Sequence, residues 1–410
     1  MSGLGSCRFC GAALSHVCAD LGVAPIANSL LTEDQLDRME PFYPLRALVC
    51  EQCFLVQVGE FESPSAIFSE YSYFSSFSTS WLAHCRDYAE SIVQRLGLGP
   101  QHTIVEVASN DGSLLQFFHE RGLSVLGIEP AENVAQAAIV KGIPTIVRFF
   151  GAEVAEDLAR TSRADLLIGN NVLPHVPDPN DFVAGMRILL KETGVITMEF
   201  PHLMRLIAEG QFDTIYHEHF SYFSLGTVAR VFERHGLTIF NVEELPTHGG
   251  SLRIYGRHAD DETKRVEESV VRLLEREREA GFGSLETYLA FAKRLPAMKR
   301  ELLRFLIDAK ERGESVAGYG APAKGTTLLN YCGIGTDFLD YTVDKSPHKQ
   351  GHYLPGVRVP IHAPDELART RPDYVFILPW NLRDEITGEL PFVRDWGGRF
   401  VVRTPELTVL

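Results

Sequence analysis

Residues 103–129 read TIVEVASNDGSLLQFFHERGLSVLGIE, and this stretch decides the fold. It begins with a short apolar strand at 103–107, turns through Ser109-Asn-Asp-Gly112 and continues as a helix at 113–121. A second apolar strand follows at 124–128. A strand, a helix and a strand in this order form the βαβ unit of a parallel, doubly wound sheet.

The same alternation continues along most of the chain. A helix is expected at 81–96, and a charged helical stretch at 261–311 is interrupted at Gly281, Gly283 and Pro296. Further elements are expected as strands at 166–168, 194–200, 315–319, 340–343, 374–378 and 399–403, with a helix at 326–331. The sequence therefore predicts two α/β sheets, a central one and a second one near the C-terminus.

Two pairs of cysteines, Cys7-x-x-Cys10 and Cys50-x-x-Cys53, precede the α/β region and are four of the seven cysteines in the chain. A two-residue spacer lets both sulfurs of a turn face one ion, and four thiolates suit a tetrahedral zinc ion. The alternative is two unrelated pairs of buried thiols. Because a closed four-sulfur site leaves no open coordination position, we expect this zinc to be structural.

The composition limits the classes of protein that fit. A chain of 410 residues, 45% hydrophobic and 23% charged, is typical of a globular protein of two or three domains. The net charge of -15 argues against a nucleic-acid partner. The sequence has no apolar run of about 18 residues and no signal-peptide pattern at MSGLGSCRFCG. We expect a cytoplasmic protein, monomeric or weakly oligomeric, without a membrane partner.

The turn after the first central strand, Glu106-Val-Ala-Ser-Asn-Asp-Gly112, lies where such sheets bind a cofactor. Methyltransferases that use S-adenosylmethionine usually carry an acidic residue here, followed by a glycine pattern. Ala108 and Asn110 replace two of those glycines. Because Asn110 and Asp111 tolerate a left-handed backbone better than most residues with a Cβ atom, the turn can stay tight.

Later polar residues extend this predicted cofactor site. Glu129 ends the second strand, where a carboxylate accepts hydrogen bonds from ribose hydroxyls. Asn170-Asn171 ends another strand, at the carboxyl edge where open α/β sheets bind ligands. The predicted cofactor-binding residues are Glu106, Ala108, Asn110, Asp111, Gly112, Glu129, Asn170 and Asn171. The alternative is another nucleotide, although the missing glycines disfavour the pyrophosphate of NAD.

Tyr216-His217-Glu218-His219 gathers a phenol, two imidazoles and a carboxylate within four residues. One interpretation is acid/base chemistry, in which a carboxylate orients a histidine and the phenol polarises a carbonyl. A metal site is a second interpretation, although the HExxH spacing is absent. A hydrogen-bonded structural cluster is the third.

A second turn, Gly318-Tyr-Gly-Ala-Pro-Ala-Lys324-Gly, follows a strand and opens a helix. Backbone amides at such a turn form an anion site, to which Lys324 adds charge. The alternatives are a solvent-exposed Lys324 and a dinucleotide cofactor, although the turn is not GxGxxG. The predicted substrate-binding residues are Gly320, Ala321, Pro322, Lys324, Asp344 and Lys345, with His348 and Lys349 also able to reach phosphates.

Together these motifs resemble the nucleotide-sugar C-methyltransferases, which modify 4-keto deoxysugars. The resemblance spans nearly the whole chain and rests on the four cysteines, on 106–112, on Gly169-Asn-Asn-Val-Leu-Pro-His175-Val, on 216–222 and on 318–325. It implies a zinc-binding lobe at 1–65, a central class I (Rossmann-like) S-adenosylmethionine-dependent methyltransferase domain at 66–250, and a helical connection with a C-terminal α/β Rossmann-like domain at 251–410 that holds the sugar nucleotide.

The resemblance also implies roles for single residues. His219 matches the proposed base and Glu218 is its neighbour, while Tyr216 matches a phenol near the keto group. Further active-site positions match His175 and one of Tyr71 and Tyr73. The aromatic loop at 71–77 is a candidate lid that keeps water out.

We therefore expect methyl transfer to the carbon next to the ketone, C-3, of a dTDP-linked 4-keto deoxysugar. The ketone lets a base remove the α-proton to give an enolate, so the reaction needs a base and an oxyanion donor. His219 suits the first task, because imidazole titrates near neutral pH, and Tyr216 suits the second. The alternatives are transfer to an oxygen or nitrogen, and a non-catalytic protein that binds sugar nucleotides.

Overall fold

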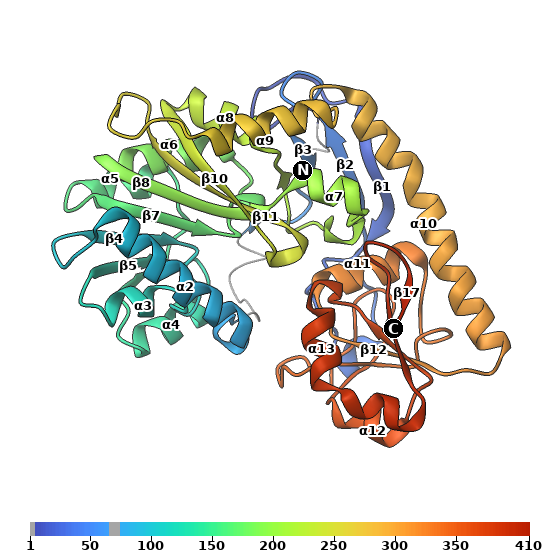
Figure 1. Ribbon diagram of the computed structural model, residues 1–410. Coiled ribbons are helices and arrows are strands. Elements are labelled where there is room, and N and C mark those ends of the chain that lie inside the picture. The colour runs from blue at the N-terminus through green and yellow to red at the C-terminus, as the bar shows by residue number, and fades with distance from the viewer. Residues whose placement is uncertain (1–4, 65–73) are drawn as a thin grey trace.

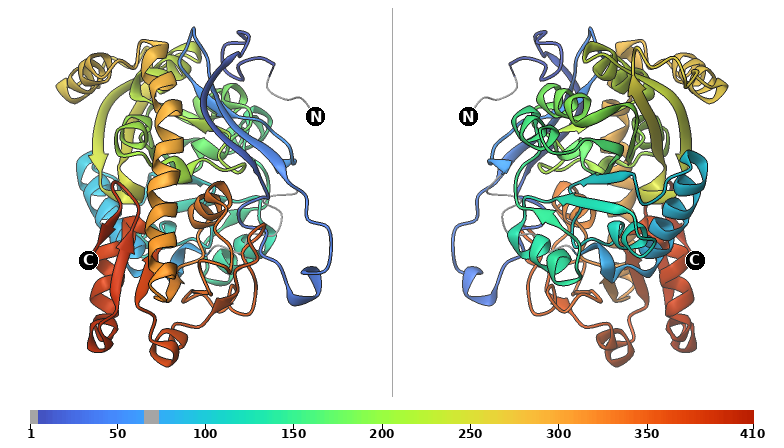
Figure 2. Two further views of the ribbon diagram at one scale, coloured as in Figure 1. Left: turned by 90° about the vertical axis from the view of Figure 1, so that its right-hand side faces the viewer. Right: turned by 90° about the vertical axis from the view of Figure 1, so that its left-hand side faces the viewer.

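The computed structural model describes residues 5–64 and 74–410 (Figure 1). Tyr71, Tyr73 and part of the expected lid at 71–77 lie outside these residues. The strands of the described residues form three sheets. Figure 2 shows helix α10 (Leu285–Glu311) running along one side of the molecule, from the N-terminal strands to the C-terminal sheet.

The N-terminal sheet is antiparallel, and its last strand comes from the middle of the chain. Its order is β1-β2-β3-β9, with bounds His16–Ala24, Tyr43–Val49, Val56–Val58 and Ser221–Tyr222. Strand β9 pairs through Tyr222 with Val56. Because β9 begins two residues after His219, the Tyr216–His219 segment is anchored on the N-terminal sheet.

The four cysteines of the two pairs converge beside this sheet. Their sulfurs all lie within 4.8 Å of one another, with 3.5 Å between the Sγ atoms of Cys7 and Cys53 and of Cys10 and Cys50. Both turns are closed by an amide that donates to the first cysteine's carbonyl, from Gly11 and from Phe54. A tetrahedral zinc ion with bonds of about 2.3 Å sets sulfurs about 3.8 Å apart, so the cluster fits zinc.

The central sheet has seven strands in the order β10-β11-β8-β7-β4-β5-β6. Strands β4 to β8 pair in parallel, while β11 pairs antiparallel with both β8 and β10. The bounds of β4, β5, β6, β7, β8, β10 and β11 are Thr103–Val107, Ser124–Ile128, Thr145–Ile146, Ala164–Asn170, Leu190–Pro201, Leu237–Leu245 and Ser251–His258.

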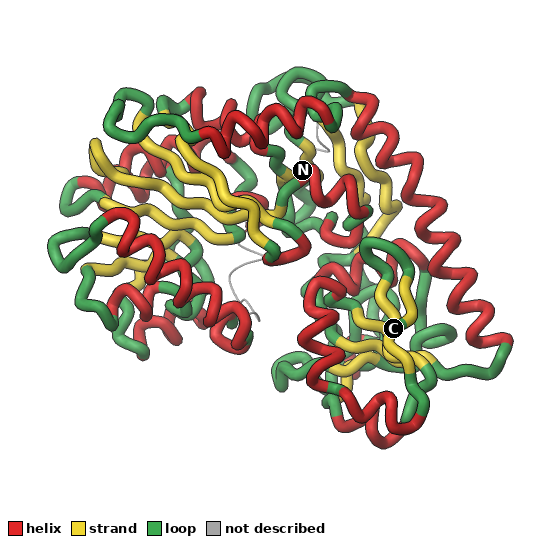
Figure 3. Tube along the Cα trace, in the orientation of Figure 1, coloured by secondary structure: helices red, strands yellow, loops and turns green. Residues whose placement is uncertain are grey.

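Helices cover both faces of the central sheet (Figure 3). Ile104 packs with α2 and α3 on one face, whereas its neighbour Val105 packs with α6 and α8 on the other. This alternation follows from the two-residue period of a strand, and burial of both faces explains the near-continuous apolar sequence. The bounds of α2 to α8 are Thr79–Leu96, Leu115–His119, Glu132–Val140, Ala152–Ala159, Pro179–Leu189, Leu203–Glu209 and Leu225–Arg234.

The C-terminal sheet is parallel except at its last strand, with the order β14-β13-β12-β15-β16-β17. These strands, from β12 to β17, are Val316–Tyr319, Thr342–Val343, Ile361–His362, Tyr374–Ile377, Arg399–Val402 and Thr408–Val409. Helices α11, α12 and α13 are Ala323–Cys332, Asp365–Thr370 and Arg383–Glu389. The predicted second α/β sheet is therefore present.

The charged helical stretch differs from the prediction at one point. Helix α9 (Glu268–Glu279) ends before Gly281 as expected, but α10 continues through Pro296 without a break. The buried residues of α10, including Tyr288, Leu295 and Leu302, recur every three or four positions and form one stripe. This stripe packs in one hydrophobic core with strands of the first and third sheets, which holds the helix together across the missing amide.

None of the helices within residues 5–64 and 74–410 has both the length and the apolarity needed to cross a bilayer. The proposed domain boundaries at residues 65 and 250 stay predictions. The core that α10 shares with the N-terminal and C-terminal sheets packs these two parts directly against each other.

Loss of one sulfur should release the metal from the cysteine cluster. We expect Cys53→Ser to bind less than half an equivalent of zinc and to lower the melting temperature, because the metal supplies folding free energy. Cys332→Ser changes a buried cysteine outside the cluster and should keep the full metal content. Metal analysis and calorimetry measure both effects; full zinc in Cys53→Ser would contradict the assignment.

Candidate active site

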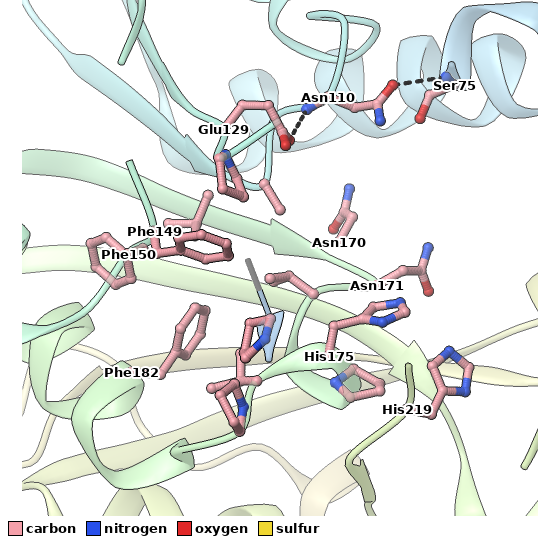
Figure 4. Close-up of a pocket in the computed structure, with 18 of the residues that line it drawn as sticks. Ser75, Asn110, Glu129, Phe149, Phe150, Asn170, Asn171, His175, Phe182 and His219 are labelled. Atoms are coloured by element: carbon pink, nitrogen blue, oxygen red, sulfur yellow. Dashed lines mark hydrogen bonds between the residues drawn. The ribbon is translucent and has the colours of Figure 1, made fainter. Parts of the chain in front are cut away.

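A pocket of about 730 Å³ lies where the three parts of the chain meet. Figure 4 shows Asn110 and Glu129 on one side of it, His175 and His219 on another, and Asn170 and Asn171 between them. Its lining combines many of the predicted cofactor, catalytic and substrate residues with others that were not predicted: Asn28, Ala108, Asn110, Glu129, Asn170, Asn171, His175, Tyr216, His219, His248, Pro322, Lys324 and Lys349.

The turn after β4 adopts the left-handed backbone expected of it. Ala108, Asn110 and Gly112 have φ angles of 55°, 50° and 75°. A Cβ atom on Gly112 would lie 3.1 Å from Ile143 Cγ1, so this position favours glycine. The amide of Ala108 donates to the carbonyl of Ile128, 2.7 Å away, which ties the turn to β5.

Glu129 is an acceptor that two backbone amides hold in place at this end of the pocket. Its two carboxylate oxygens accept from the amides of Asn110 and Ala131, each at 2.9 Å. Burial raises the pKa of Glu129, and the two amides act against that rise. Each oxygen keeps a further lone pair for a ligand, which fits the hydroxyls of a ribose.

Asn170 and Asn171 end β7 and face the same pocket. The Nδ2 atom of Asn170 is buried and has no hydrogen-bond partner among the described residues. Since buried polar groups are rarely left unpaired, this atom fits a ligand donor site. The Glu129 and Asn170 side chains together therefore suit an adenosine-type cofactor.

Three predicted cofactor residues do not line the pocket. Gly112 shapes the turn, and Asp111 lies beneath it in an ion pair with Lys141 at 3.0 Å. Glu106 is buried, and burial together with the charges of Glu129 and Asp111 raises its pKa well above the usual range. Glu106 therefore lies behind the turn and not in the pocket lining.

His219 has a fixed tautomer. Its Nδ1 lies 2.9 Å from the carbonyl oxygen of Thr214, and its Nε2 lies 2.9 Å from the hydroxyl of Tyr216. Because a carbonyl only accepts, Nδ1 carries the proton and Nε2 keeps its lone pair. The Tyr216 hydroxyl therefore donates to Nε2. We refer to Tyr216 and His219 as the dyad.

The dyad is kept neutral by its surroundings. Burial, followed by the neighbouring His175, lowers the pKa of His219 well below its usual value, and Lys324 and His248 add to the effect. The His175 ring lies 4.7 Å from that of His219, and burial lowers the pKa of His175 to about 4. Its Nδ1 donates to the carbonyl oxygen of Glu218, 2.7 Å away. At neutral pH the His219 ring is thus neutral, and its Nε2 accepts from Tyr216.

The Glu218 carboxylate does not orient His219, which departs from one sequence-based interpretation. It accepts instead from the backbone amide and the side-chain amide of Asn28, at 3.2 and 2.5 Å. Burial raises the pKa of Glu218 to about 7 against the effect of these bonds. The amide of His219 donates to the carbonyl of Tyr216, so the chain turns here. The backbone carbonyl of Thr214 is what orients His219.

His217 lies away from the pocket and packs on the N-terminal lobe. Its Nε2 lies 3.2 Å from the carbonyl of Pro44, and its ring contacts those of Tyr43 and Phe61. The four residues of the segment thus have two separate roles. Tyr216 and His219 face the pocket, while His217 and Glu218 attach the segment to the N-terminal part of the chain.

The turn after β12 is more internally bonded than the sequence suggested. The amide of Gly320 donates to Val343, and that of Ala321 donates to the Asp344 carboxylate at 2.8 Å. Asp344 also accepts from the amide of Ser346, so it braces the turn. The side chain of Lys345 is 57% exposed and pairs with Glu389, away from the pocket lining.

Two lysines of this region reach the pocket. Lys349 Nζ donates to the carbonyl of Ala321 at 2.8 Å. Lys324 Nζ donates to Asn381 Oδ1 at 2.8 Å and lies 4.6 Å from the centre of the Trp380 ring. Burial lowers the pKa of Lys324 to about 8, so a simple solvent-exposed lysine does not describe it.

Sequence reasoning missed His248, Asn28 and Trp380. His248 has a φ of 54°, and its Nε2 lies 3.1 Å from Asn171 Nδ2. A strained histidine at a pocket is a common mark of a functional site. The sequence His248-Gly-Gly250 could have pointed to His248, because a polar residue before two glycines often marks a tight functional turn.

The open, largely parallel sheet with its ligand site at the carboxyl edge of β4, β5 and β7 defines the class, an S-adenosylmethionine-dependent methyltransferase. Residues 81–242 match the family model "Methyltransferase domain", and residues 246–405 match "C-methyltransferase C-terminal domain". Residues 7–68, which include all four clustered cysteines, match "Putative zinc binding domain". The protein thus uses S-adenosylmethionine and carries a zinc site.

The chain belongs to the family of zinc-containing, S-adenosylmethionine-dependent C-methyltransferases. It is 37% identical to the C-methyltransferase NovU of Streptomyces niveus over 408 residues, 98% of this chain and 96% of the relative. This membership favours carbon over oxygen or nitrogen as the methyl acceptor, and an enzyme over a non-catalytic binding protein.

Solved structures also resemble part of the chain. The magnesium protoporphyrin IX methyltransferase ChlM of Synechocystis PCC 6803 with bound SAM shows 16% identity and a TM-score of 0.33, covering 43% of this chain and 80% of its own. The CcbJ methyltransferase of Streptomyces caelestis shows 13% identity and a TM-score of 0.34, with coverages of 43% and 89%. The PH0226 protein of Pyrococcus horikoshii shows 14% identity and a TM-score of 0.37, covering 48% of this chain and 99% of its own.

Removing one charge at Glu129 should weaken cofactor binding. In Glu129→Gln an amide group would face the backbone amide of Asn110 or Ala131, so the turn loosens and an acceptor is lost. We expect the dissociation constant of S-adenosylhomocysteine, measured by calorimetry, to rise about 10- to 100-fold. Glu132→Gln, an exposed neighbour on α4, is the control and should bind normally. Equal affinities for both variants would remove Glu129 from the site.

Proposed function

We propose that this C-methyltransferase acts on a nucleotide-linked 4-keto deoxysugar and methylates the carbon next to the ketone, C-3. The main support is that the neutral Tyr216–His219 dyad faces the same pocket as Glu129 and Asn170. A base beside a cofactor site is what carbon methylation needs, because a sugar carbon becomes a nucleophile only after it loses its proton. Transfer to an existing hydroxyl or amine needs no such enolate.

The dyad supplies the base in this proposal. The lone pair on His219 Nε2 receives the phenol proton of Tyr216 as the phenol oxygen, 2.9 Å away, takes the proton of the substrate. Thr214 fixes the ring so that Nε2, not Nδ1, faces Tyr216. The low pKa of His219 keeps the ring neutral at neutral pH, and the transferred proton then creates a charge that the Thr214 carbonyl helps to stabilise.

S-adenosylmethionine supplies an electrophilic methyl group when it is bound. In the proposal Glu129 and Asn170 orient this cofactor from the carboxyl edge of the sheet, because they offer a fixed acceptor and an unpaired donor. Val107, Ile128 and Phe182 contribute apolar walls to the pocket. Such walls limit the access of water, which would reprotonate the enolate.

The nucleotide end of the substrate would lie toward the C-terminal part of the pocket. Pro322 and Lys349 line that part, and the first amides of α11 begin at Ala323. Lys349 has two ammonium protons beyond the one donated to Ala321, which suits a phosphate oxygen. The cytoplasm remains the expected place of the reaction.

His219→Ala tests the base. We expect methyl transfer, and deuterium exchange at the sugar α-carbon in deuterated water, to fall by about 10³-fold, since proton removal loses its acceptor. Affinity for S-adenosylhomocysteine should stay within about threefold of the wild type. His119→Ala, exposed on α3, is the matched control. Exchange at the wild-type rate in His219→Ala would exclude the base role.

The substrate class has its own test. We expect one methyl group to be added to at least one member of a panel of 4-keto deoxysugar nucleotides, detected by mass spectrometry, with S-adenosylhomocysteine formed in equal amount. The corresponding 4-hydroxy sugars should not react, because their α-hydrogens are not acidic. Methylation of the 4-hydroxy sugars as well would show that no enolate is required.

A further inference from the structure

In the proposed reaction the ketone oxygen gains negative charge, and the dyad does not donate a hydrogen bond to it. Tyr216 has one hydroxyl proton, and it is directed at His219 Nε2. The same proton cannot also form a hydrogen bond to the substrate's oxygen while the dyad is intact. An enolate in a water-poor pocket needs a donor at that oxygen, and the structure must therefore supply one elsewhere.

Lys324 has the position and the charge for this task. It lines the pocket together with Tyr216 and His219. His248 lines the same pocket, and the positive charge of Lys324 lowers the pKa of both His219 and His248. Lys349 also lines the pocket, but it donates to the carbonyl of Ala321 and its charge lowers the pKa of Glu218.

The surroundings of Lys324 hold the ammonium group in place without neutralising it. Asn381 accepts one of its three protons at 2.8 Å, and the Trp380 ring covers it at 4.6 Å. Within the part of the chain that the structure describes, Lys324 has no carboxylate at ion-pair distance; Asp213 acts on it from farther away. The Asp213 carboxylate accepts from Trp380 Nε1 at 2.7 Å. A desolvated cation with a free N–H is suited to an anionic ligand.

We propose that Lys324 is a catalytic residue that donates a hydrogen bond to the ketone oxygen as it becomes the enolate oxyanion. This inference rests on the proposed function and deepens it. The α C–H bond breaks and its proton passes to the dyad, while its electron pair forms the C=C bond and the carbonyl π pair moves to the oxygen facing Lys324. The C–C bond to the methyl group then forms as the S–CH3 bond breaks, its electron pair stays on sulfur, and the ketone returns.

A phosphate contact, the role expected from the sequence, would leave a different kinetic signature. An oxyanion donor strengthens its bond in the transition state, so its loss lowers kcat and leaves KM nearly unchanged. A phosphate anchor binds substrate and transition state alike, so its loss raises KM and the dissociation constant of the free nucleoside diphosphate. These two outcomes separate the ketone from the phosphates as the partner of Lys324.

The experiment compares Lys324→Met with Lys293→Met, an exposed lysine on α10 that serves as the control. For Lys324→Met we expect kcat and α-proton exchange to fall about 10²- to 10³-fold. KM and the dissociation constant of thymidine diphosphate should stay within about threefold. A tenfold or larger rise in both binding constants, with kcat retained, would overturn the proposal in favour of a phosphate anchor.

A second variant covers the case in which Lys324→Met does not fold, as judged by melting temperature and S-adenosylhomocysteine binding. Lys324→Arg keeps the charge, and a guanidinium still binds phosphate, but it moves the donor. We expect a fall in kcat at constant KM, whereas wild-type kinetics would overturn the inference.

If the wild-type enzyme itself shows no exchange on any 4-keto substrate, the proposed function fails. Equal exchange in the wild type and in Lys324→Met would overturn only the role of Lys324.

Discussion

The geometry of the proposed active site depends on one hydrogen bond, from His219 Nδ1 to the carbonyl oxygen of Thr214. A backbone carbonyl cannot donate, so this bond admits one tautomer of the neutral ring and places its lone pair on Nε2. The Tyr216 hydroxyl must donate to Nε2, and the donor for a developing oxyanion must therefore come from another element.

The fold protects that bond by fixing the segment around it from two sides. Asn28 holds Glu218, and β9 joins the N-terminal sheet immediately after the segment. Helix α10 packs against the same N-terminal sheet and continues to the C-terminal sheet, so the element that carries Lys324 shares a core with the element that supports His219. The cysteine cluster lies beside the small sheet whose last strand follows the dyad, so a bound zinc ion would stabilise the part of the chain that anchors the dyad.

The sequence was sufficient where the information is local. The β4 turn needed a left-handed backbone at Asn110, and the four cysteines had the spacing of a metal site; both features have the predicted geometry. It was insufficient where partners are distant. Asn28 and Glu218 are separated by 190 positions, so no short pattern could show that the carboxylate faces Asn28 and not His219. The predicted interruption at Pro296 was wrong for the same reason, because the packing that keeps α10 continuous comes from strands of two distant sheets.

Burial is the largest cause of the pKa shifts of the histidines and of Lys324 in the pocket. Burial lowers the pKa values of His175 and His248 to about 4, so both rings are neutral, yet it leaves Lys324 near 8 and thus mostly charged at neutral pH. Lysine starts from a much higher pKa than histidine, so the same desolvation separates the two kinds of side chain into neutral acceptors and a cation. Because burial of Lys324 reduces screening by solvent, that cation acts strongly on any negative charge that forms nearby. A site of this kind favours a reaction that creates an anion over one that begins with one, and proton removal beside a ketone is such a reaction.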